Sequence, residues 1–184
     1  MLGILYDIHG NLDALNPVLA DAAGVDRWLL EPPEDRPEVT DTYERFRGQI
    51  PDEEVRWLYS LPPQAELDGV LYVHGSPLAD DESFAAEPQQ GEECLLAGVR
   101  DRTIVFGHSH LQFRRPGPNG TDLVNPGSVG MPLDGDRRAA WATWEGDFAF
   151  RRTGYDVEPA AAAYREMGGD FGEFAARRIE KGSD

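Results

Sequence analysis

All four histidines of the sequence stand immediately after short apolar runs. They are His9, His74, His108 and His110. An apolar run that ends in polar residues predicts a buried strand followed by a loop, and the loops beyond the carboxyl ends of strands line the ligand-binding crevice of an open α/β sheet. We therefore expect the four imidazoles to converge on one site.

The neighbours of the histidines favour a metal site. A lone loop histidine is more often a hydrogen-bonding group than a ligand, but here Asp7 forms an Asp-x-His pattern, and His-Gly and His-x-His patterns occur at the other two places. Glycine adjoins each pattern and lets the backbone approach a compact centre closely. Neutral imidazole with a carboxylate, and without thiolate, suits Mn, Zn, Fe, Ni or Co and suits calcium poorly.

The spacing leaves the number of ions open. If His108-Ser109-His110 is extended, both rings point to one side of the chain, whereas a turn points them apart. One divalent ion and two divalent ions are both consistent with these alternatives.

Strands and one helix are predicted to position these side chains. Residues 2–6 predict a buried strand, and Asn11 suits the N-cap of a helix whose apolar residues recur at helical spacing from Leu12 to Leu19. Residues 70–73 and 103–106 predict strands that end at histidine motifs. The later sequence, rich in turn signals, predicts short strands over residues 111–115, 121–124, 139–145 and 147–152.

Further helices are expected in the acidic segment before residue 60 and in the C-terminal tail. One is predicted around residues 39–46, and Pro51 with its acidic neighbours opens another that runs towards Tyr59. The alanine-rich tail over residues 159–179 predicts one or two helices broken at Gly168-Gly169. Mixed strands and helices followed by antiparallel hairpins indicate an α/β sandwich, in a single domain over residues 1–184.

The composition argues against several classes of function. With 17 Lys and Arg against 34 Asp and Glu among 184 residues, the formal net charge is −17, which argues against binding along an extended nucleic-acid backbone. No apolar run approaches the roughly 20 residues that span a bilayer, and no signal-peptide pattern is present, so we expect no membrane partner and a cytoplasmic location. Cys94 is the single cysteine, which excludes an internal disulfide and a thiolate-rich zinc site.

Three arginine pairs interrupt this acidic chain. They are Arg114-Arg115, Arg137-Arg138 and Arg151-Arg152. These pairs could steer an anionic substrate towards the site. The alternative is that they are charged strand edges, which protect against aggregation.

Four sequence blocks contain the candidate ligands and their neighbours. They are Asp7-Ile8-His9-Gly10-Asn11, Val73-His74-Gly75-Ser76-Pro77, Gly107-His108-Ser109-His110 and Asn125-Pro126-Gly127-Ser128-Val129-Gly130. In this order they resemble the calcineurin-like metallophosphoesterases, in particular the small bacterial phosphodiesterase branch, and the similarity extends over nearly the whole chain. The resemblance implies a metallophosphoesterase-type αββα sandwich. It also implies that Asp7, His9 and His110 bind one metal ion and that His74 and His108 bind another.

The resemblance also implies supporting residues and an activity. Gly10, Asn11, Gly75 and Asn125 would bind phosphate or support the ligands from behind. Gly10 and Asn11 would place a helix N-terminus near a bound phosphate. The implied activity is hydrolysis of phosphomonoesters or phosphodiesters by metal-activated hydroxide.

Two motifs of this family are missing. The family has a Gly-Asp whose aspartate bridges both metals and a Gly-Asn-His-Asp-like stretch that supplies an asparagine ligand, but here residues 22–30 run straight on. We interpret Gly24-Val25-Asp26-Arg27 as a join across a deletion and expect the sandwich to be shortened by loss of a strand–helix segment. Asp26 is either a surrogate ligand or a surface aspartate at a helix end. Tyr6 stands where relatives have a small residue, and it could crowd the first metal.

The leading hypothesis is a metal-dependent phosphoesterase that acts on a small phosphate ester with one or two divalent transition-metal ions. No general acid can be assigned. The alternative is a metal- or phosphate-binding protein on the same scaffold with weakened catalysis. A third interpretation, a structural zinc domain, requires the chain to unfold when metal is removed. A homo-oligomer is compatible with all three.

Overall fold

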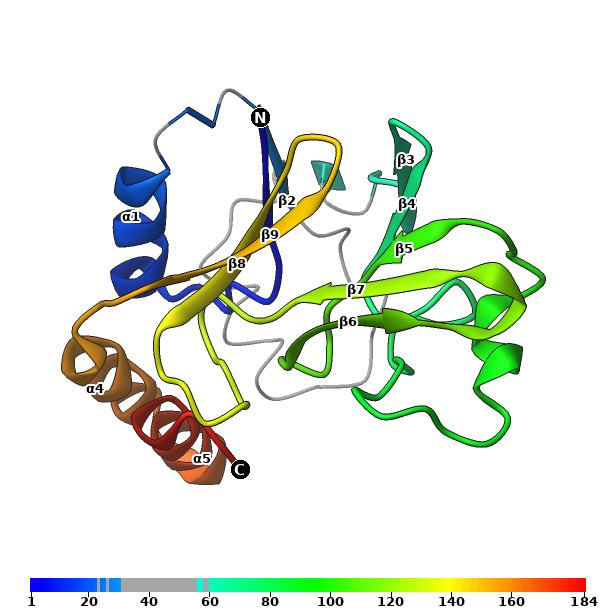
Figure 1. The fold of residues 1–184 in the computed structure, drawn as a ribbon. Coiled ribbons are helices and arrows are strands. Elements are labelled where there is room, and N and C mark those ends of the chain that lie inside the picture. The colour runs from blue at the N-terminus through cyan, green and yellow to red at the C-terminus, as the bar shows by residue number, and fades with distance from the viewer. Residues whose placement is uncertain (23, 26, 31–55, 58–59) are drawn as a thin grey trace.

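Two β-sheets pack face to face in the computed structural model of the chain (Figure 1). The structure describes residues 1–22, 24–25, 27–30, 56–57 and 60–184. The first sheet contains, in spatial order, β2 (Arg27–Leu30), β1 (Leu2–Leu5), β8 (Ala139–Trp144) and β9 (Phe148–Thr153). The second sheet contains β3 (Gln64–Leu67), β4 (Val70–Val73), β5 (Thr103–Val105), β7 (Asp122–Pro126) and β6 (Gln112–Pro116).

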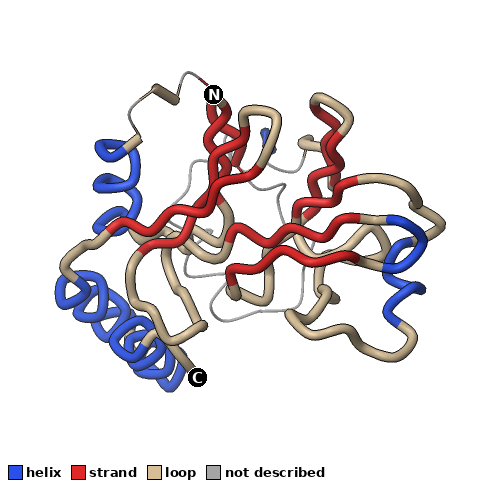
Figure 2. The backbone as a smooth tube through the Cα atoms, viewed as in Figure 1, coloured by secondary structure: helices blue, strands red, loops and turns tan. Residues whose placement is uncertain are grey.

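Helices flank the first sheet. They are α1 (Leu12–Asp21), α4 (Val157–Met167) and α5 (Gly169–Lys181), and Figure 2 shows them gathered on one side of the molecule. The outer face of the second sheet is covered, in the described part of the chain, by the segment between β4 and β5, which includes the short 3-10 helix η1 (Glu92–Leu96). A second 3-10 turn, η2 (Pro118–Gly120), joins β6 to β7. None of the described helices has the length and apolar character that a bilayer span requires.

Most elements predicted from the sequence are present. The strand before the first histidine, both strands before the other histidine motifs and all four later strands are confirmed within two residues at each end, as is the helix capped by Asn11. The helical tail is confirmed as two helices that meet at Gly168. The helices predicted at 39–46 and 51–59 fall outside the described residues, except that Arg56 and Trp57 are helical.

Residues 27–30 form a strand next to the place where the sequence predicted a join across a deletion. They form β2, which pairs in parallel with β1 from Leu2 opposite Arg27 to Leu5 opposite Leu30. A strand therefore occupies the edge beside β1 directly after α1. Asp26 and residues 31–55 lie outside the described part of the chain.

The main core lies between the two sheets. Its buried side chains come from β1 and β8 on one side and from β4, β5 and β7 on the other. They are Leu2, Ile4, Tyr6, Val70, Tyr72, Val105, Val124 and Ala142. All four residues of β1 are buried, because its second face is covered by α1 through Leu5, Ala14 and Val18. The strands that end at the candidate ligands are thus held from both faces.

A buried ion pair fixes the covering segment to the edge strand of the second sheet. Arg115 on β6 forms two hydrogen bonds to the Glu92 carboxylate, at 2.6 and 2.9 Å. It also donates twice to the carbonyl oxygen of Ala85, at 2.9 and 3.0 Å. The side chains of Arg115 and Glu92 are 9% and 6% exposed. Arg115 is therefore a structural residue, unlike either alternative considered for the arginine pairs.

Arg115→Met is expected to lower the free energy of unfolding by about 3 kcal/mol, because it leaves the Glu92 carboxylate buried without its partner. Urea unfolding followed by circular dichroism measures the change. Adding Glu92→Gln should recover part of the loss, since a neutral amide costs less to bury than a charge. A loss under about 0.5 kcal/mol for Arg115→Met, typical of an exposed ion pair, would contradict the prediction.

Candidate metal centre

Asp7 lies at the carboxyl end of β1 and links three loops. It is buried, and its φ of 50° places its backbone in the left-handed region. Its Oδ2 accepts a hydrogen bond from the backbone N–H of His108 at 3.0 Å. Its carbonyl oxygen accepts bonds from the Ser128 hydroxyl at 2.8 Å and from the Gly130 N–H at 3.0 Å. These bonds orient the carboxylate.

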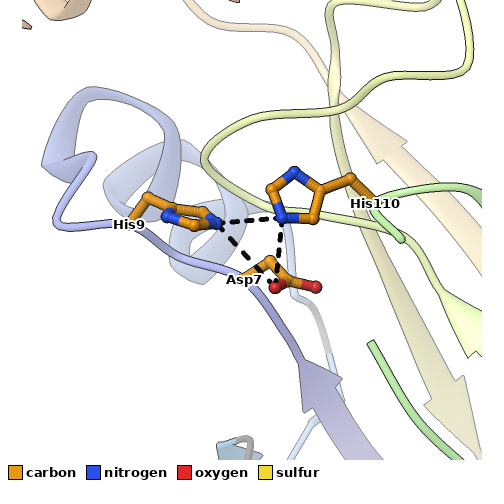
Figure 3. A group of neighbouring side chains, drawn as sticks. All are labelled: Asp7, His9 and His110. Atoms are coloured by element: carbon orange, nitrogen blue, oxygen red, sulfur yellow. Dashed lines mark hydrogen bonds and ion pairs between the residues drawn. The ribbon is translucent and has the colours of Figure 1, made fainter. Parts of the chain in front are cut away.

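Two histidine rings face the other oxygen of this carboxylate (Figure 3). Nε2 of His110 lies 3.3 Å and Nε2 of His9 lies 3.8 Å from Oδ1 of Asp7, and the two nitrogens are 3.1 Å apart. A triangle with these edges has its corners about 2 Å from a common centre, and bonds from zinc to nitrogen or oxygen are about 2.0–2.2 Å long. The three atoms therefore fit the ligand set of one divalent transition-metal ion.

A backbone contact fixes the tautomer of His110. Its Nδ1 lies 2.7 Å from the carbonyl oxygen of Met131. Because a carbonyl oxygen only accepts, Nδ1 carries the hydrogen, and in the neutral ring Nε2 presents its lone pair to Asp7. Metal-binding histidines commonly make such a bond from their outer nitrogen.

The three facing atoms need a proton or a metal cation between them. Burial raises the pKa of the Asp7 carboxyl, but a hydrogen bond from His110 and the positive charges of His110, His74 and His9, when these rings are protonated, together outweigh burial, so the net shift is downward. An ionised carboxylate only accepts hydrogen bonds. Two acceptors in contact repel each other unless a proton or a metal cation lies between them. The charge and the geometry of the cluster therefore both suit a cation.

The remaining histidines form a separate pair. Nδ1 of His108 lies 3.4 Å from Nε2 of His74, and the ring planes are 82° apart. His108-Ser109-His110 is a turn, since the Ser109 N–H donates to the Gly107 carbonyl at 2.7 Å and both histidines have positive φ. The rings consequently point to different partners. Within the described residues, no carboxylate completes a cluster of three ligands around this second pair.

Left-handed backbone is concentrated at the site. Asp7, His9, His108 and His110 have φ between 50° and 65°, and they make up half of the described non-glycine residues with positive φ. Such a conformation costs roughly 1–3 kcal/mol and persists where the surrounding structure determines it strongly. The conformations that direct these four side chains therefore lower the stability of the fold.

Asn11 and Gly10 lie in the turn between β1 and α1. The Asn11 side chain accepts a bond from the Ala14 N–H at 3.0 Å, which caps α1, and donates to the Gly130 carbonyl at 2.9 Å. Asn11 is buried, whereas Gly10 is exposed and has a φ of 67°. The turn therefore connects the helix N-terminus to the loop that carries Gly130, directly beside His9.

Asn125 and Gly75 are buried beneath the histidine loops. The Asn125 amide donates to the Gly107 carbonyl and the Ser109 hydroxyl, each at 3.0 Å, and accepts from the Gly127 N–H at 2.9 Å. At Gly75, a Cβ atom would collide with the backbone five residues further along. Both residues determine the shape of the loops. The Asn125 side-chain amide makes its hydrogen bonds to other groups of the protein.

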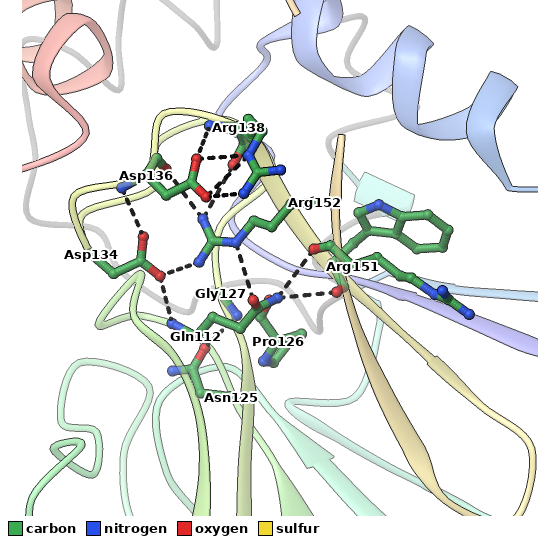
Figure 4. Close-up of polar contacts among 10 residues, drawn as sticks. Gln112, Asn125, Pro126, Gly127, Asp134, Asp136, Arg138, Arg151 and Arg152 are labelled. Carbon is green, nitrogen blue, oxygen red and sulfur yellow. Dashed lines mark hydrogen bonds and ion pairs between the residues drawn. The ribbon is translucent and has the colours of Figure 1, made fainter. Parts of the chain in front are cut away.

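Arg152 on β9 anchors the loop over residues 131–138 (Figure 4). It donates from Nε to the Gln112 side chain at 3.1 Å and from Nη1 to two carbonyl oxygens of this loop, at 3.2 and 3.3 Å. It also forms an ion pair with Asp134, whose carboxylate accepts from the Gln112 N–H at 3.2 Å. The same loop begins with the carbonyl that orients His110, so Arg152 also has a structural role.

Sequence reasoning missed three groups that orient the candidate ligands. The Met131 carbonyl and the His108 N–H act through the backbone, so no residue type marks them. The Ser128 hydroxyl bonds to the Asp7 carbonyl, and its place in the Asn-Pro-Gly-Ser-Val-Gly block was the available signal. Tyr6, which the sequence suggested could crowd the first metal, belongs to the core between the sheets, and its hydroxyl donates to the Val105 carbonyl at 3.2 Å.

Two solved structures have a similar fold. A metallophosphoesterase from Sphaerobacter thermophilus has a TM-score of 0.75 at 22% sequence identity, over 98% of this chain and 98% of that chain. A hypothetical protein from Pyrococcus horikoshii OT3 has a TM-score of 0.71 at 16% identity, over 100% of both chains. No protein-family model and no curated protein matches the sequence. At identities this low, the similarity establishes the fold.

Gly107→Ala is expected to destabilise the protein by about 1–3 kcal/mol, because the added Cβ would lie 2.5 Å from both Asp7 Oδ2 and the Tyr6 ring. Gly154→Ala is the matched control, since no atom lies within 4 Å of its Cβ position. Urea unfolding compares the two variants. The prediction fails if both lose the same free energy.

Proposed function

We propose that this chain, which has the metallophosphoesterase fold, is a metal-dependent phosphoesterase that hydrolyses a small phosphate ester. The observation that carries the proposal is the cluster of Asp7, His9 and His110, whose ligand atoms all lie within 4.8 Å of one another. The αββα fold class expected from the sequence agrees with the similarity to the solved structures.

The three cluster residues have distinct parts in the proposed site. A divalent ion, when bound, supplies a Lewis acid for phosphoryl oxygens and lowers the pKa of a water molecule. Asp7 supplies the negative charge, and His110, oriented by Met131, supplies a lone pair from a fixed direction. The His9 side chain is 35% exposed against 9% for His110. We infer that substrate approaches from the His9 side.

His74 and His108 provide a second, weaker position. Their facing nitrogens are 3.4 Å apart, within the range of two ligands on one ion, but this pair brings no negative charge of its own. We assign no general acid. The substrate we propose is a small molecule, because the net charge of −17 disfavours binding along an extended nucleic-acid backbone.

Metal-stripped protein is expected to bind one Mn²⁺ or Zn²⁺ tightly in phosphate-free buffer, and a second only when phosphate is added. Two divalent ions about 3.5 Å apart repel by about 19 kcal/mol at an effective dielectric constant of about 20, and the described ligands include one carboxylate, Asp7. A bridging anion would offset this repulsion. Isothermal titration calorimetry with and without phosphate measures both stoichiometries.

Two variants separate the positions in this titration. His108→Ala should keep the first ion and lose the phosphate-dependent second, whereas Asp7→Asn should lose the first. Two equivalent tight ions without phosphate would contradict the expected inequality of the sites.

Hydrolysis of bis-para-nitrophenyl phosphate with added Mn²⁺ tests the enzyme itself. We expect turnover by the native chain and a loss of about 100-fold or more for His110→Ala, since even the groups that support ligands typically contribute 10–100-fold. Gly154→Ala, at an exposed and open position, should retain activity.

The outcomes of this assay distinguish the hypotheses. Metal binding without turnover on phosphomonoesters and phosphodiesters would favour a metal- or phosphate-binding protein on the same scaffold. Turnover that His110→Ala leaves unchanged would exclude the proposed site.

A further inference from the structure

The C-terminal pair of helices, α4 and α5, contacts the turn that carries His9 and packs against the 131–133 segment, which is hydrogen-bonded to His110. Its buried residues form one apolar group with Met131, and Leu133 packs against that group. Met131 accepts the hydrogen bond from His110 through its carbonyl, and the Leu133 N–H donates to the His110 carbonyl at 3.3 Å. The two helices therefore support the position of His110 through the 131–133 segment.

The same helices contact the His9 backbone directly. The Tyr164 hydroxyl on α4 donates to the carbonyl oxygen of His9 at 2.8 Å. Tyr164 is buried. Because a carbonyl oxygen only accepts hydrogen bonds, the Tyr164 hydroxyl is the donor.

The bond from Tyr164 holds the His9 peptide in the turn between β1 and α1. In the turn after β1, the Asn11 N–H donates to the Ile8 carbonyl and the Leu12 N–H donates to the Gly10 carbonyl, each at 3.0 Å. The His9 carbonyl, between them, accepts from Tyr164. His9 has a strained φ of 52°, and its ring direction follows from this backbone conformation.

We propose that Tyr164 is a positioning residue that holds His9 in the geometry required of a metal ligand, which makes the C-terminal helix pair part of the metal site. The inference rests on the proposed function, because it assigns His9 a metal. Tyr164 lies far along the chain from the histidine blocks, and its hydroxyl bonds to the backbone carbonyl of His9 rather than to the His9 ring. Its effect passes through the His9 peptide.

Tyr164→Phe is the test, because it removes the hydroxyl and keeps the ring packed. Loss of one hydrogen bond of about 1 kcal/mol predicts metal binding weakened about three- to ten-fold, measured by titration calorimetry with Mn²⁺ or Zn²⁺ alone. The visible absorption spectrum of bound Co²⁺ should also change, since it reports ligand geometry. The exchange of the Asn11 and Leu12 amide hydrogens in metal-free protein should become about three- to ten-fold faster.

Ile179→Val is the matched control. Ile179 is fully buried in the same apolar group as Tyr164, so its truncation weakens helix packing without altering the bond to His9. The control should bind metal within about two-fold of the native chain and should keep the native Co²⁺ spectrum. Equal weakening by both variants would overturn the proposal, because the effect would then be general destabilisation.

The remaining outcomes separate this inference from the proposed function. If the native chain binds metal and Tyr164→Phe binds it equally well with an unchanged Co²⁺ spectrum, the positioning role is wrong and the phosphoesterase proposal stands. If the native chain binds no metal, the phosphoesterase proposal fails, and the amide exchange decides whether Tyr164 holds the His9 turn. Exchange that is unchanged in Tyr164→Phe would then overturn the positioning role as well.

Discussion

The candidate site depends on the contacts of one buried carboxylate, that of Asp7, with groups from separate loops. Oδ2 of Asp7 is held by the His108 N–H, its carbonyl is held by Ser128 and Gly130, and Oδ1 faces His9 and His110. The loops after β1, β5 and β7 therefore meet at a single residue. An ionised group at this depth costs several kcal/mol unless it is well partnered. The surrounding donors and histidines supply those partners, which explains why three separate loops converge here.

Much of this arrangement could be predicted from the sequence. Apolar runs that end in Asp7, His74 and His108 specify strands whose carboxyl ends carry the candidate ligands, because burial of both strand faces selects such runs. The family resemblance implied the pairing of His110 with His9 and of His108 with His74, whereas the residue spacing alone left it open. It depends on the left-handed φ values at the turn, and histidine in that conformation leaves no mark in a sequence pattern.

The contacts that orient the ligands were beyond the reach of sequence patterns for a related reason. The Met131 carbonyl and the His108 N–H are backbone groups that every residue except proline has in full. Tyr164 reaches His9 across 155 positions, and an aromatic residue on an apolar helix face predicts only packing. β2 was also missed, since Arg27–Leu30 is short and begins with a charged residue, and parallel pairing with β1 is what makes it a strand.

The distribution of apolar packing bears on whether the fold itself depends on an ion. Four apolar clusters account for the described core: one between the sheets, one on each outer sheet face and one within the C-terminal helices. Asp7 and the four histidines belong to none of them. A domain that folds only around a structural metal lacks such cores and gains most of its folding free energy from the ion. Here the apolar surfaces are already buried against one another, which argues against the structural zinc interpretation. The packing of the core thus supports the strained backbone at the candidate ligand positions.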